Sequence, residues 1–209
     1  MTESGRVLSI QSHTVHGYVG NKCAVFPLQL HGFEVDPINS VQFSNHTGYK
    51  SWRGEVLQGE QLWALVQGLH ENELLEGYTH VLTGYIGSVS FLETVLRSVE
   101  LLKRVNPHIA FFCDPVMGDH GKLYVPEALV AIYAEKVVPI AAVLTPNQFE
   151  AEMLTGSEIT SLKAASDACK DLHSRGPHTV IITSLTLCSK EAATKAAATA
   201  ATAATAATA

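Results

Sequence analysis

The stretch of sequence that decides the fold is Ile-Ala-Phe-Phe-Cys-Asp-Pro-Val-Met-Gly-Asp, residues 109–119. An apolar run leads directly into a turn with acidic side chains, and Ala-Ala-Val-Leu-Thr-Pro-Asn-Gln-Phe-Glu, residues 141–150, repeats this arrangement. A short apolar run bounded by turn residues indicates a buried strand. Hard cations bind oxygen ligands. The two strand ends carry such ligands in their carboxylates, hydroxyl and amide, and they therefore predict a site for a metal-bound phosphate.

Strands and helices alternate on both sides of these two stretches. We expect strands at residues 7–10, 35–43 (interrupted by Pro37), 79–83, 109–112, 141–144 and 179–182. Apolar residues at helical spacing predict helices at residues 22–30, 60–69 and 91–105. The alternation predicts an α/β fold with a mostly parallel central sheet and helices on both faces. Ligands in such folds bind at the carboxyl ends of the strands, where both polar stretches fall.

The composition is that of a globular protein. Hydrophobic residues make up 46% and charged residues 16% of the 209 residues, which suits one domain, expected at residues 1–188. The net charge of -6 and the lack of a Lys/Arg cluster argue against nucleic-acid binding. No stretch has the features of a signal peptide or reaches membrane-spanning length, so we expect a cytoplasmic protein with no membrane partner.

The cysteines and the C-terminal segment carry no functional signal. The four cysteines are scattered without the spacing of a zinc site, and free thiols in a reducing compartment fit this pattern best. Residues 189–209 are a low-complexity tail of Ala and Thr, with Thr at every third position from Thr199 to Thr208. Nothing in this tail supplies a packing face, so we expect no function from it.

Several further motifs occur in one unbroken order with the two polar stretches. They are Ser-Ile-Gln-Ser-His at 9–13, Gly-Tyr-Val-Gly-Asn at 17–21, the run at 39–49 and Leu-Thr-Gly-Tyr at 82–85. Together, over residues 5–184, they closely resemble the pyridoxal kinase family of the ribokinase-like superfamily. The resemblance implies a ribokinase-like fold, a homodimer, and transfer of the ATP γ-phosphate to the 5′-hydroxyl of pyridoxal, pyridoxine or pyridoxamine in vitamin B6 salvage.

The resemblance assigns roles to residues at the vitamin end of the site. Ser12 would hydrogen-bond the pyridine ring, and Thr47 would hold a ring substituent. Val19 and Tyr85 would pack around the ring, and the aromatic side chain of Tyr85 offers a stacking face.

A second set of residues is implied at the phosphate end. The expected ATP-binding residues are Asp114, Tyr124, Asn147, Glu150, Thr183 and Ser184. The expected metal-binding residues are Asp114, Asp119, Thr145 and Thr183, for Mg²⁺ or another divalent cation and for K⁺ or Na⁺. The residues themselves support a metal, because carboxylates so close together would repel ATP unless cations intervene.

Some of the residues assigned to the phosphate end also have a purely structural interpretation. Asp114 before a proline can initiate a turn, and Asn147 with Glu150 can form the capping box of a helix. A helix N-terminus that faces phosphate suits both interpretations of that box.

His13, His16 and His46 lack the spacing of a zinc site, so we expect them to be hydrogen-bonding loop residues. Cys113 is expected to be a small buried apolar residue.

The resemblance also calls for a segment that these residues lack. Enzymes of this superfamily carry Gly-Thr-Gly-Asp, whose Asp is the general base and whose glycine amides form an anion hole. That tetrapeptide does not occur in the 209 residues, and the resemblance ends near Ser184. We therefore expect a fold that is incomplete at its C-terminus, no catalytic residue, and impaired phosphate transfer.

Two other functions fit the same residues. One is a related vitamin kinase acting on hydroxymethylpyrimidine, although the long run at 39–49 favours pyridoxal. The other is a protein that binds vitamin B6, or partners a second subunit, without transferring phosphate. Binding of pyridoxal without turnover of ATP distinguishes this last function from the kinase.

Overall fold

The structure, a computed structural model, describes residues 5–187 of the chain. Its strands are β1 (Arg6–Thr14), β2 (Glu34–Phe43), β3 (Gly54–Val56), β4 (His80–Thr83), β5 (Ala110–Cys113), β6 (Gly118–Asp119), β7 (Lys122–Leu123), β8 (Val143–Leu144) and β9 (Thr179–Val180). Its α-helices are α1 (Asn21–Leu30), α2 (Gly59–Glu71), α3 (Val89–Val105), α4 (Ala128–Ile132), α5 (Gln148–Thr155) and α6 (Leu162–Ser174). Shorter helical turns are η1 (Leu75–Gly77), η2 (Tyr133–Val137) and η3 (Val138–Ile140).

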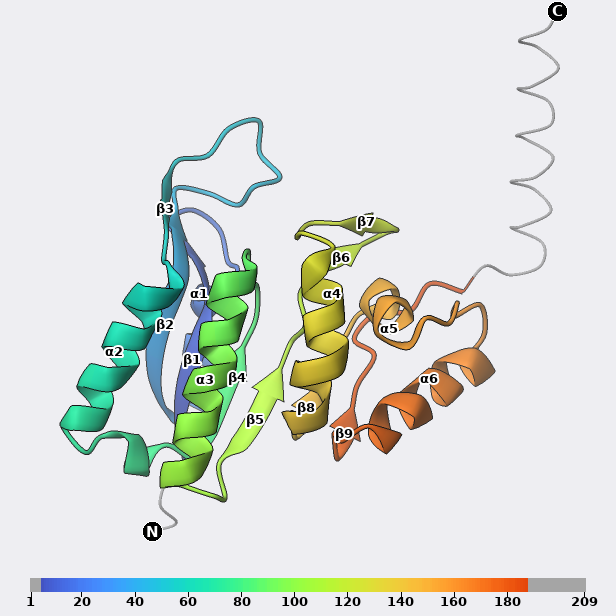
Figure 1. Cartoon of the computed structure of the whole chain (residues 1–209). Helices are drawn as coiled ribbons and strands as arrows, with labels where there is room; N and C mark the ends of the chain where they lie inside the picture. Colours follow the sequence, from blue (N-terminus) through green and yellow to red (C-terminus); the bar gives the residue numbers. More distant parts are fainter. Residues whose placement is uncertain (1–4, 188–209) are drawn as a thin grey trace, which may run out of the picture.

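Within the described residues, one sheet has the strand order β3-β2-β1-β4-β5-β8-β9. All neighbouring pairs are parallel except β2 with β3, which pair antiparallel at one edge. The expected mostly parallel sheet is therefore confirmed. Figure 1 shows α2 and α3 side by side against this sheet, with β6 and β7 forming a separate hairpin beyond it.

The order of the strands also locates the place where a ligand would bind. The chain moves from β1 through α1 to β2 in one direction along the sheet, and from β4 through α3 to β5 in the other. Because such connections are right-handed, α1 and α3 cover opposite faces. The direction changes between β1 and β4, and ligands of open α/β sheets bind at the carboxyl ends of the strands at such a point.

Strand β2 corrects one prediction, since it runs through Pro37 without interruption. Proline lacks the N–H that a central strand needs, so an interruption is expected there. In the structure β1 pairs with β2 along this stretch, and β3 pairs only with Val41–Phe43 on the other side. Pro37 therefore lies where β2 has one neighbour, and its missing donor leaves no partner unpaired.

Other strand boundaries also differ from those expected. Strand β1 continues four residues past Ile10 to Thr14, so the motif at 9–13 belongs to the sheet and not to a loop. Strands β8 and β9 are shorter than predicted, with two residues each. The β6–β7 hairpin was not predicted; its turn uses positive φ angles at His120 (49°) and Gly121 (75°), as a tight two-residue hairpin requires.

The core lies on both sides of the central strands. Helix α3 begins at Ser88, whose hydroxyl accepts a hydrogen bond from the Phe91 N–H, and its buried face packs on the sheet. In α2, Leu62 is fully buried, but Leu65 is 49% exposed. The side of α2 that carries Leu62 packs against α3 and the core, and the side that carries Leu65 faces outward.

Two expectations bear on the class of the protein. Among residues 5–187 no helix is long and apolar enough to cross a membrane. Three of the four cysteines, Cys23, Cys113 and Cys169, lie in this part of the chain and are free thiols, as expected. The predicted Ala/Thr tail at 189–209 lies outside the described residues.

The contrast between Leu62 and Leu65 can be measured. Leu62→Ala should lower the free energy of unfolding by about 2–5 kcal/mol, because it leaves a cavity under α2. Leu65→Ala on the same helix is the matched control and should cost less than about 1 kcal/mol. Urea denaturation followed by circular dichroism measures both values. Equal losses would mean that α2 does not pack as the structure has it.

Candidate functional site

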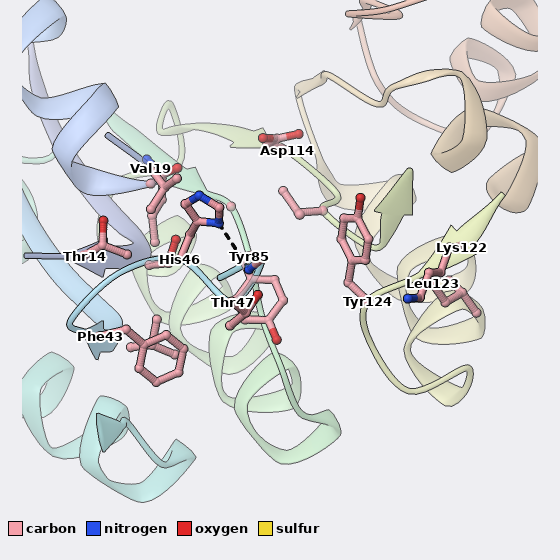
Figure 2. Close-up of a pocket in the computed structure, with 17 residues that line it drawn as sticks. Thr14, Val19, Phe43, His46, Thr47, Tyr85, Asp114, Lys122, Leu123 and Tyr124 are labelled. Atoms are coloured by element: carbon pink, nitrogen blue, oxygen red, sulfur yellow. Dashed lines mark hydrogen bonds between the residues drawn. The ribbon is translucent and has the colours of Figure 1, made fainter. Parts of the chain in front are cut away.

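A cavity of about 730 Å³ opens at the carboxyl ends of the central strands (Figure 2). It lies at the point where the direction of the chain along the sheet changes, as the topology requires. The cavity brings together six of the residues singled out from the sequence: Ser12, Val19, Thr47, Tyr85, Asp114 and Tyr124. All four residues expected at the vitamin end are among them.

The end of β1 is shaped by a buried polar network around Asn21, the first residue of α1. The Asn21 side chain accepts a hydrogen bond from Ser9 Oγ (2.8 Å) and donates to the Ile38 carbonyl (3.0 Å). Its Nδ2 also donates to Asn39 Oδ1 (2.9 Å). The amide thus joins α1, β1 and β2 beside the irregularity in β1 between Gln11 and Ser12. Because the buried amide has its hydrogen bonds satisfied only in this arrangement, it holds the end of β1 in a single position.

Gly20 brings the loop before α1 into direct contact with Ser12. Its φ is +54°, and a Cβ atom built on it would lie 2.1 Å from the Ser12 carbonyl oxygen and 2.5 Å from Ser12 Oγ. No larger residue fits there without displacing Ser12. The glycine of the Gly-Tyr-Val-Gly-Asn motif is therefore what lets Val19 and Ser12 line the same cavity.

The loop after β2 contributes Thr47 and His46 to the cavity wall. The Gly48 N–H donates to His46 Nδ1 (3.2 Å), which leaves the second ring nitrogen to carry the proton when the histidine is neutral. The His46 ring also packs edge-on against Tyr49, with ring centroids 4.6 Å apart. His46 is thus a hydrogen-bonding loop residue, as predicted.

Tyr85 follows β4 and is held by a residue of β2, which lies two strands away in the sheet. The Ser40 hydroxyl donates to the Tyr85 carbonyl (3.2 Å), and burial raises the pKa of the Tyr85 phenol. The phenol is therefore neutral across the physiological range and offers an uncharged aromatic face to the cavity.

Asp114 is the carboxylate that lines the cavity, at the end of β5. Its N–H donates to the Thr83 carbonyl (2.9 Å), which continues the β4–β5 pairing into the turn. Burial raises the pKa of Asp114 to about 6, and a hydrogen bond from the Thr145 side chain opposes the rise. Beside it, Cys113 is fully buried, and burial raises the pKa of its thiol, so it is the inert core residue that was expected.

The pair Asn147 and Glu150 forms the predicted capping box of α5. Asn147 Oδ1 accepts from the Glu150 N–H (2.9 Å), and Glu150 Oε2 accepts from the Asn147 N–H (2.8 Å). The other carboxylate oxygen of Glu150 accepts from the Met117 N–H (3.0 Å), and Asn147 Nδ2 donates to the Gly118 carbonyl (2.7 Å). Both residues therefore tie the 114–119 turn to the start of α5.

Glu150 is almost completely buried, at 2% exposure. Burial raises the pKa of its carboxyl to about 7, although the backbone N–H groups of Asn147 and Met117 oppose the rise. Both of its oxygens are engaged by backbone donors in this conformation. Its contribution here is to position the turn, and its expected contact with ATP stays a prediction.

Thr183 and Ser184 meet the same region from the other side. The Thr183 N–H donates to the Pro146 carbonyl (2.9 Å), and the Gln148 N–H donates to the Ser184 carbonyl (3.1 Å). These two residues, with Thr145, gather at the end of β8 and do not line the cavity. The residues expected at the phosphate end thus form a second group, linked to the cavity through Asp114.

Asp119 lies apart from both groups, on the β6–β7 hairpin. Its carboxylate accepts from the His120 N–H (2.8 Å), and the side chain is 41% exposed. In the part of the chain that the structure describes, no three His, Cys, Asp or Glu side chains come close enough together to hold a metal ion. The donors that do meet are one carboxylate, Asp114, and the hydroxyl of Thr145.

The cavity wall includes residues that were not singled out from the sequence. They are Gln11, Thr14, Val41, Phe43, Lys122 and Leu123, with three glycines and Val116. Most of them lie within the sequence motifs that carry the family resemblance, so their position in those motifs was the available signal. Lys122 and Leu123 line the cavity from the β6–β7 hairpin, on the side of Tyr124 (Figure 2), and no local pattern indicated this placement.

With this geometry established, three comparisons place the chain among known proteins. A family model described as phosphomethylpyrimidine kinase matches residues 72–208. The chain is 65% identical over 186 residues to a pyridoxal kinase of Arabidopsis thaliana, covering 89% of this chain and 60% of the relative. It is 53% identical over 195 residues to human pyridoxal kinase, covering 91% of this chain and 62% of the relative.

A solved structure is similar in fold as well as in sequence. Pyridoxal kinase from Leishmania donovani, in complex with ADP and pyridoxine, has a TM-score of 0.83 at 44% identity. The match covers 87% of this chain and 64% of that one. The chain therefore spans about three fifths of the length of the curated relatives it matches.

The raised pKa of Asp114 predicts a pH effect on stability. Because the folded pKa of about 6 lies above the ordinary value of 3.8, folding favours the protonated carboxyl. The resulting stabilisation is complete below about pH 4 and is lost as the pH rises through about 6.

Asp114→Asn should remove this dependence. The unfolding free energy of the wild type, minus that of the variant, should fall by up to ~3 kcal/mol between pH 4 and pH 7. Urea titrations at a series of pH values measure the difference, with Asp167→Asn on the exposed face of α6 as control. A difference that is flat with pH, or rises with it, would show that folding does not raise the pKa of Asp114.

Proposed function

This chain belongs to the pyridoxal kinase family, and on that premise we propose that it carries the vitamin-binding part of an ATP-dependent kinase. The reaction is transfer of the γ-phosphate of ATP to the 5′-hydroxyl of pyridoxal, with pyridoxine and pyridoxamine as further substrates. The observation that carries the proposal is the assembly of Ser12, Val19, Thr47 and Tyr85 around one cavity, from four separate segments of the chain.

The vitamin end suits a small aromatic ring with polar substituents. Val19, Val41 and Phe43 supply apolar surface, and the neutral phenol of Tyr85 adds an aromatic face. Ser12 and Thr47 supply hydroxyls that can donate or accept hydrogen bonds to ring atoms. An apolar cavity with a few convergent polar groups is the usual form of a small-molecule site.

The phosphate end suits a triphosphate accompanied by cations. The N-terminus of α5 supplies the positive end of a helix dipole next to Asn147, and Lys122 places an ammonium group in the cavity wall. Asp114 and Thr145 offer hard oxygen donors that fit Mg²⁺ or a monovalent cation, with Thr183 and Ser184 close to Pro146. A bound cation would neutralise charge on the phosphates, and the residues of this chain would orient the two substrates.

The general base is not supplied by the Gly-Thr-Gly-Asp segment, because these 209 residues do not contain it. General bases and anion holes each contribute about 10²-fold or more to the rate. The chain by itself should therefore bind pyridoxal but transfer phosphate slowly, and full activity should require residues that this sequence does not include. The homodimer that the resemblance implies, and the cytoplasmic location expected from the sequence, belong to this proposal.

A second substrate class follows from the family model, which is described as phosphomethylpyrimidine kinase. The relatives at 53% and 65% identity are pyridoxal kinases, and they favour pyridoxal over a hydroxymethylpyrimidine. Equilibrium binding of both compounds to the purified chain distinguishes the two. Tighter binding of the pyrimidine would overturn the choice of pyridoxal.

The central test measures binding and turnover separately. Titration calorimetry with pyridoxal reports the vitamin site, and formation of pyridoxal 5′-phosphate from pyridoxal, Mg-ATP and K⁺ reports transfer. A chain extended after Ser184 with the C-terminal segment of a relative runs in parallel. We expect both chains to bind pyridoxal and only the extended one to turn over rapidly. Rapid turnover by the 209-residue chain would contradict the proposed need for a further base.

Ser12 provides a specific prediction at the vitamin end. Ser12→Ala should weaken pyridoxal binding about 3- to 10-fold, the usual effect of losing one hydrogen bond to a ligand. Ser157→Ala, at an exposed position after α5, is the matched control and should bind as the wild type does. Unchanged binding by the Ser12 variant would remove Ser12 from the proposed contacts.

Lys122 provides a prediction for the phosphorylated product. Lys122→Met should weaken binding of pyridoxal 5′-phosphate about 2- to 5-fold and leave pyridoxal binding nearly unchanged, because only the product carries the phosphate charge. The effect should shrink at high salt, since Lys122 is exposed. Lys163→Met, on the exposed face of α6, is the control. Equal losses for both ligands would argue against a charge interaction.

A further inference from the structure

Gln11, on β1, presents a side-chain oxygen to the cavity. The residue lines the cavity, and its Nε2 donates to Ser9 Oγ (2.9 Å), while its Oε1 accepts no hydrogen bond from the described residues. The fully buried side-chain atoms of residues 5–187 that lack a partner belong to His13, Thr14 and Tyr133, and the Gln11 oxygen is not one of them. Because this oxygen has no partner and is not enclosed, it is open to the cavity.

Gly84, which follows β4, fixes where that oxygen lies. A Cβ atom built on Gly84 would lie 2.7 Å from Gln11 Oε1, and Gly84 itself lines the cavity. Any larger residue at this position would push the amide of Gln11 aside. The missing side chain of Gly84 therefore leaves room for the oxygen at the cavity wall.

The buried network behind Gln11 decides which end of its amide faces the cavity. Asn21 Nδ2 lies 3.0 Å from the Ile38 carbonyl, which can only accept, so Asn21 turns its Oδ1 toward Ser9. The Ser9 hydroxyl gives its single hydrogen to Asn21 Oδ1 (2.8 Å), so toward Gln11 it can only accept. Gln11 must therefore direct its NH₂ group to Ser9 and its oxygen away from Ser9.

The cavity thus meets this network through one acceptor. Ser9 is 0% exposed and Asn21 is 2% exposed, and neither lines the cavity. Reversing the Gln11 amide would set its oxygen against Ser9 Oγ, whose hydrogen is already used, and would leave two acceptors unpaired. The hydroxyls of Ser12 and Thr47 can rotate to donate or accept, but Gln11 is held as an acceptor.

Building on the proposed function, we propose that Gln11 is a further ligand-contacting residue of the vitamin site and acts there only as a hydrogen-bond acceptor. A hydroxyl or amino hydrogen of the bound ligand donates to Gln11 Oε1. Ser9 and Asn21 are positioning residues, because they hold the amide in this orientation without touching the ligand. Gln11 therefore selects a ligand by hydrogen-bond polarity, since a group that offers only lone pairs at this place leaves the acceptor unpaired.

The proposal predicts a coupling between Gln11 and Ser9 in ligand affinity. Gln11→Met removes the acceptor with little change in side-chain size and should weaken pyridoxal binding at least about 5-fold. Ser9→Ala removes no ligand contact but frees the amide to reverse, so binding should weaken about 2- to 3-fold. The double variant should bind no more weakly than Gln11→Met alone, because it has no amide left to orient.

The experiment measures pyridoxal affinity of the wild type and the variants by titration calorimetry, and their melting temperatures without ligand. Ser98→Ala is the matched control, since Ser98 is also 0% exposed and its hydroxyl donates to the Thr94 carbonyl (2.8 Å) within α3, away from the cavity. It should bind pyridoxal as the wild type does. Should Gln11→Met fail to fold, the comparison of Ser9→Ala with Ser98→Ala decides.

Four outcomes would count against the proposal. Wild-type affinity in Gln11→Met, or in Ser9→Ala, would overturn the inference, while the proposed function would stand. Additive losses in the double variant would also overturn it, because Ser9 would then act independently of Gln11. An equal loss of affinity in Ser98→Ala would assign the effect to stability alone. Absence of pyridoxal binding by the wild type would overturn the proposed function and this inference with it.

Discussion

The side-chain amide of Asn21 is the interaction on which the site depends. It is 2% exposed and joins the first turn of α1 to Ser9 on β1 and to Ile38 and Asn39 on β2. Because a buried amide is costly when unpaired, this network admits one arrangement of the three elements. That arrangement places Gly20 against the end of β1, and the loop before α1 then closes one side of the cavity.

The opposite side of the cavity depends on two carboxyl groups with different tasks, the buried Glu150 and the half-buried Asp114. Glu150 gives both oxygens to backbone N–H groups and so holds the 114–119 turn on α5. Asp114 meets the Thr145 side chain, and its carboxyl also lines the cavity. Burial raises the pKa of both, so each lowers the stability of the folded state at neutral pH. Groups that weaken the fold in this way gather where ligands bind.

The fold could be predicted in outline from the chain because apolar runs and turns alternate along it. The same local patterns misjudged positions whose environment is set by distant elements. Pro37 lies within a strand because β3 pairs only beyond it. The β6–β7 hairpin escaped notice because two-residue strands have no periodicity to detect.

The candidate site likewise contains residues that the sequence marked and residues that it did not mark. The four residues expected at the vitamin end, Ser12, Val19, Thr47 and Tyr85, each stand in a distinctive run of the sequence and line one cavity, and their contacts with a vitamin stay a prediction. Among the residues expected at the phosphate end, Asp119 accepts a hydrogen bond from its neighbour His120 and does not line the cavity. No local pattern in the sequence marked Lys122 or Thr14 as residues of the cavity wall. Their positions depend on how the β6–β7 hairpin and the end of β1 pack against the rest of the fold.

The sequence by itself determined the α/β class, the approximate places of the strands, and the identity of most polar residues at their carboxyl ends. It could do so because burial and turn formation leave local periodicity and composition in the chain. Only the tertiary structure decided which of those residues share a cavity, that Glu150 also accepts a hydrogen bond from the distant Met117 N–H, and which buried side-chain atoms of the described residues stay unpaired. Those properties depend on distances between segments far apart in the chain, and neither periodicity nor composition carries that information.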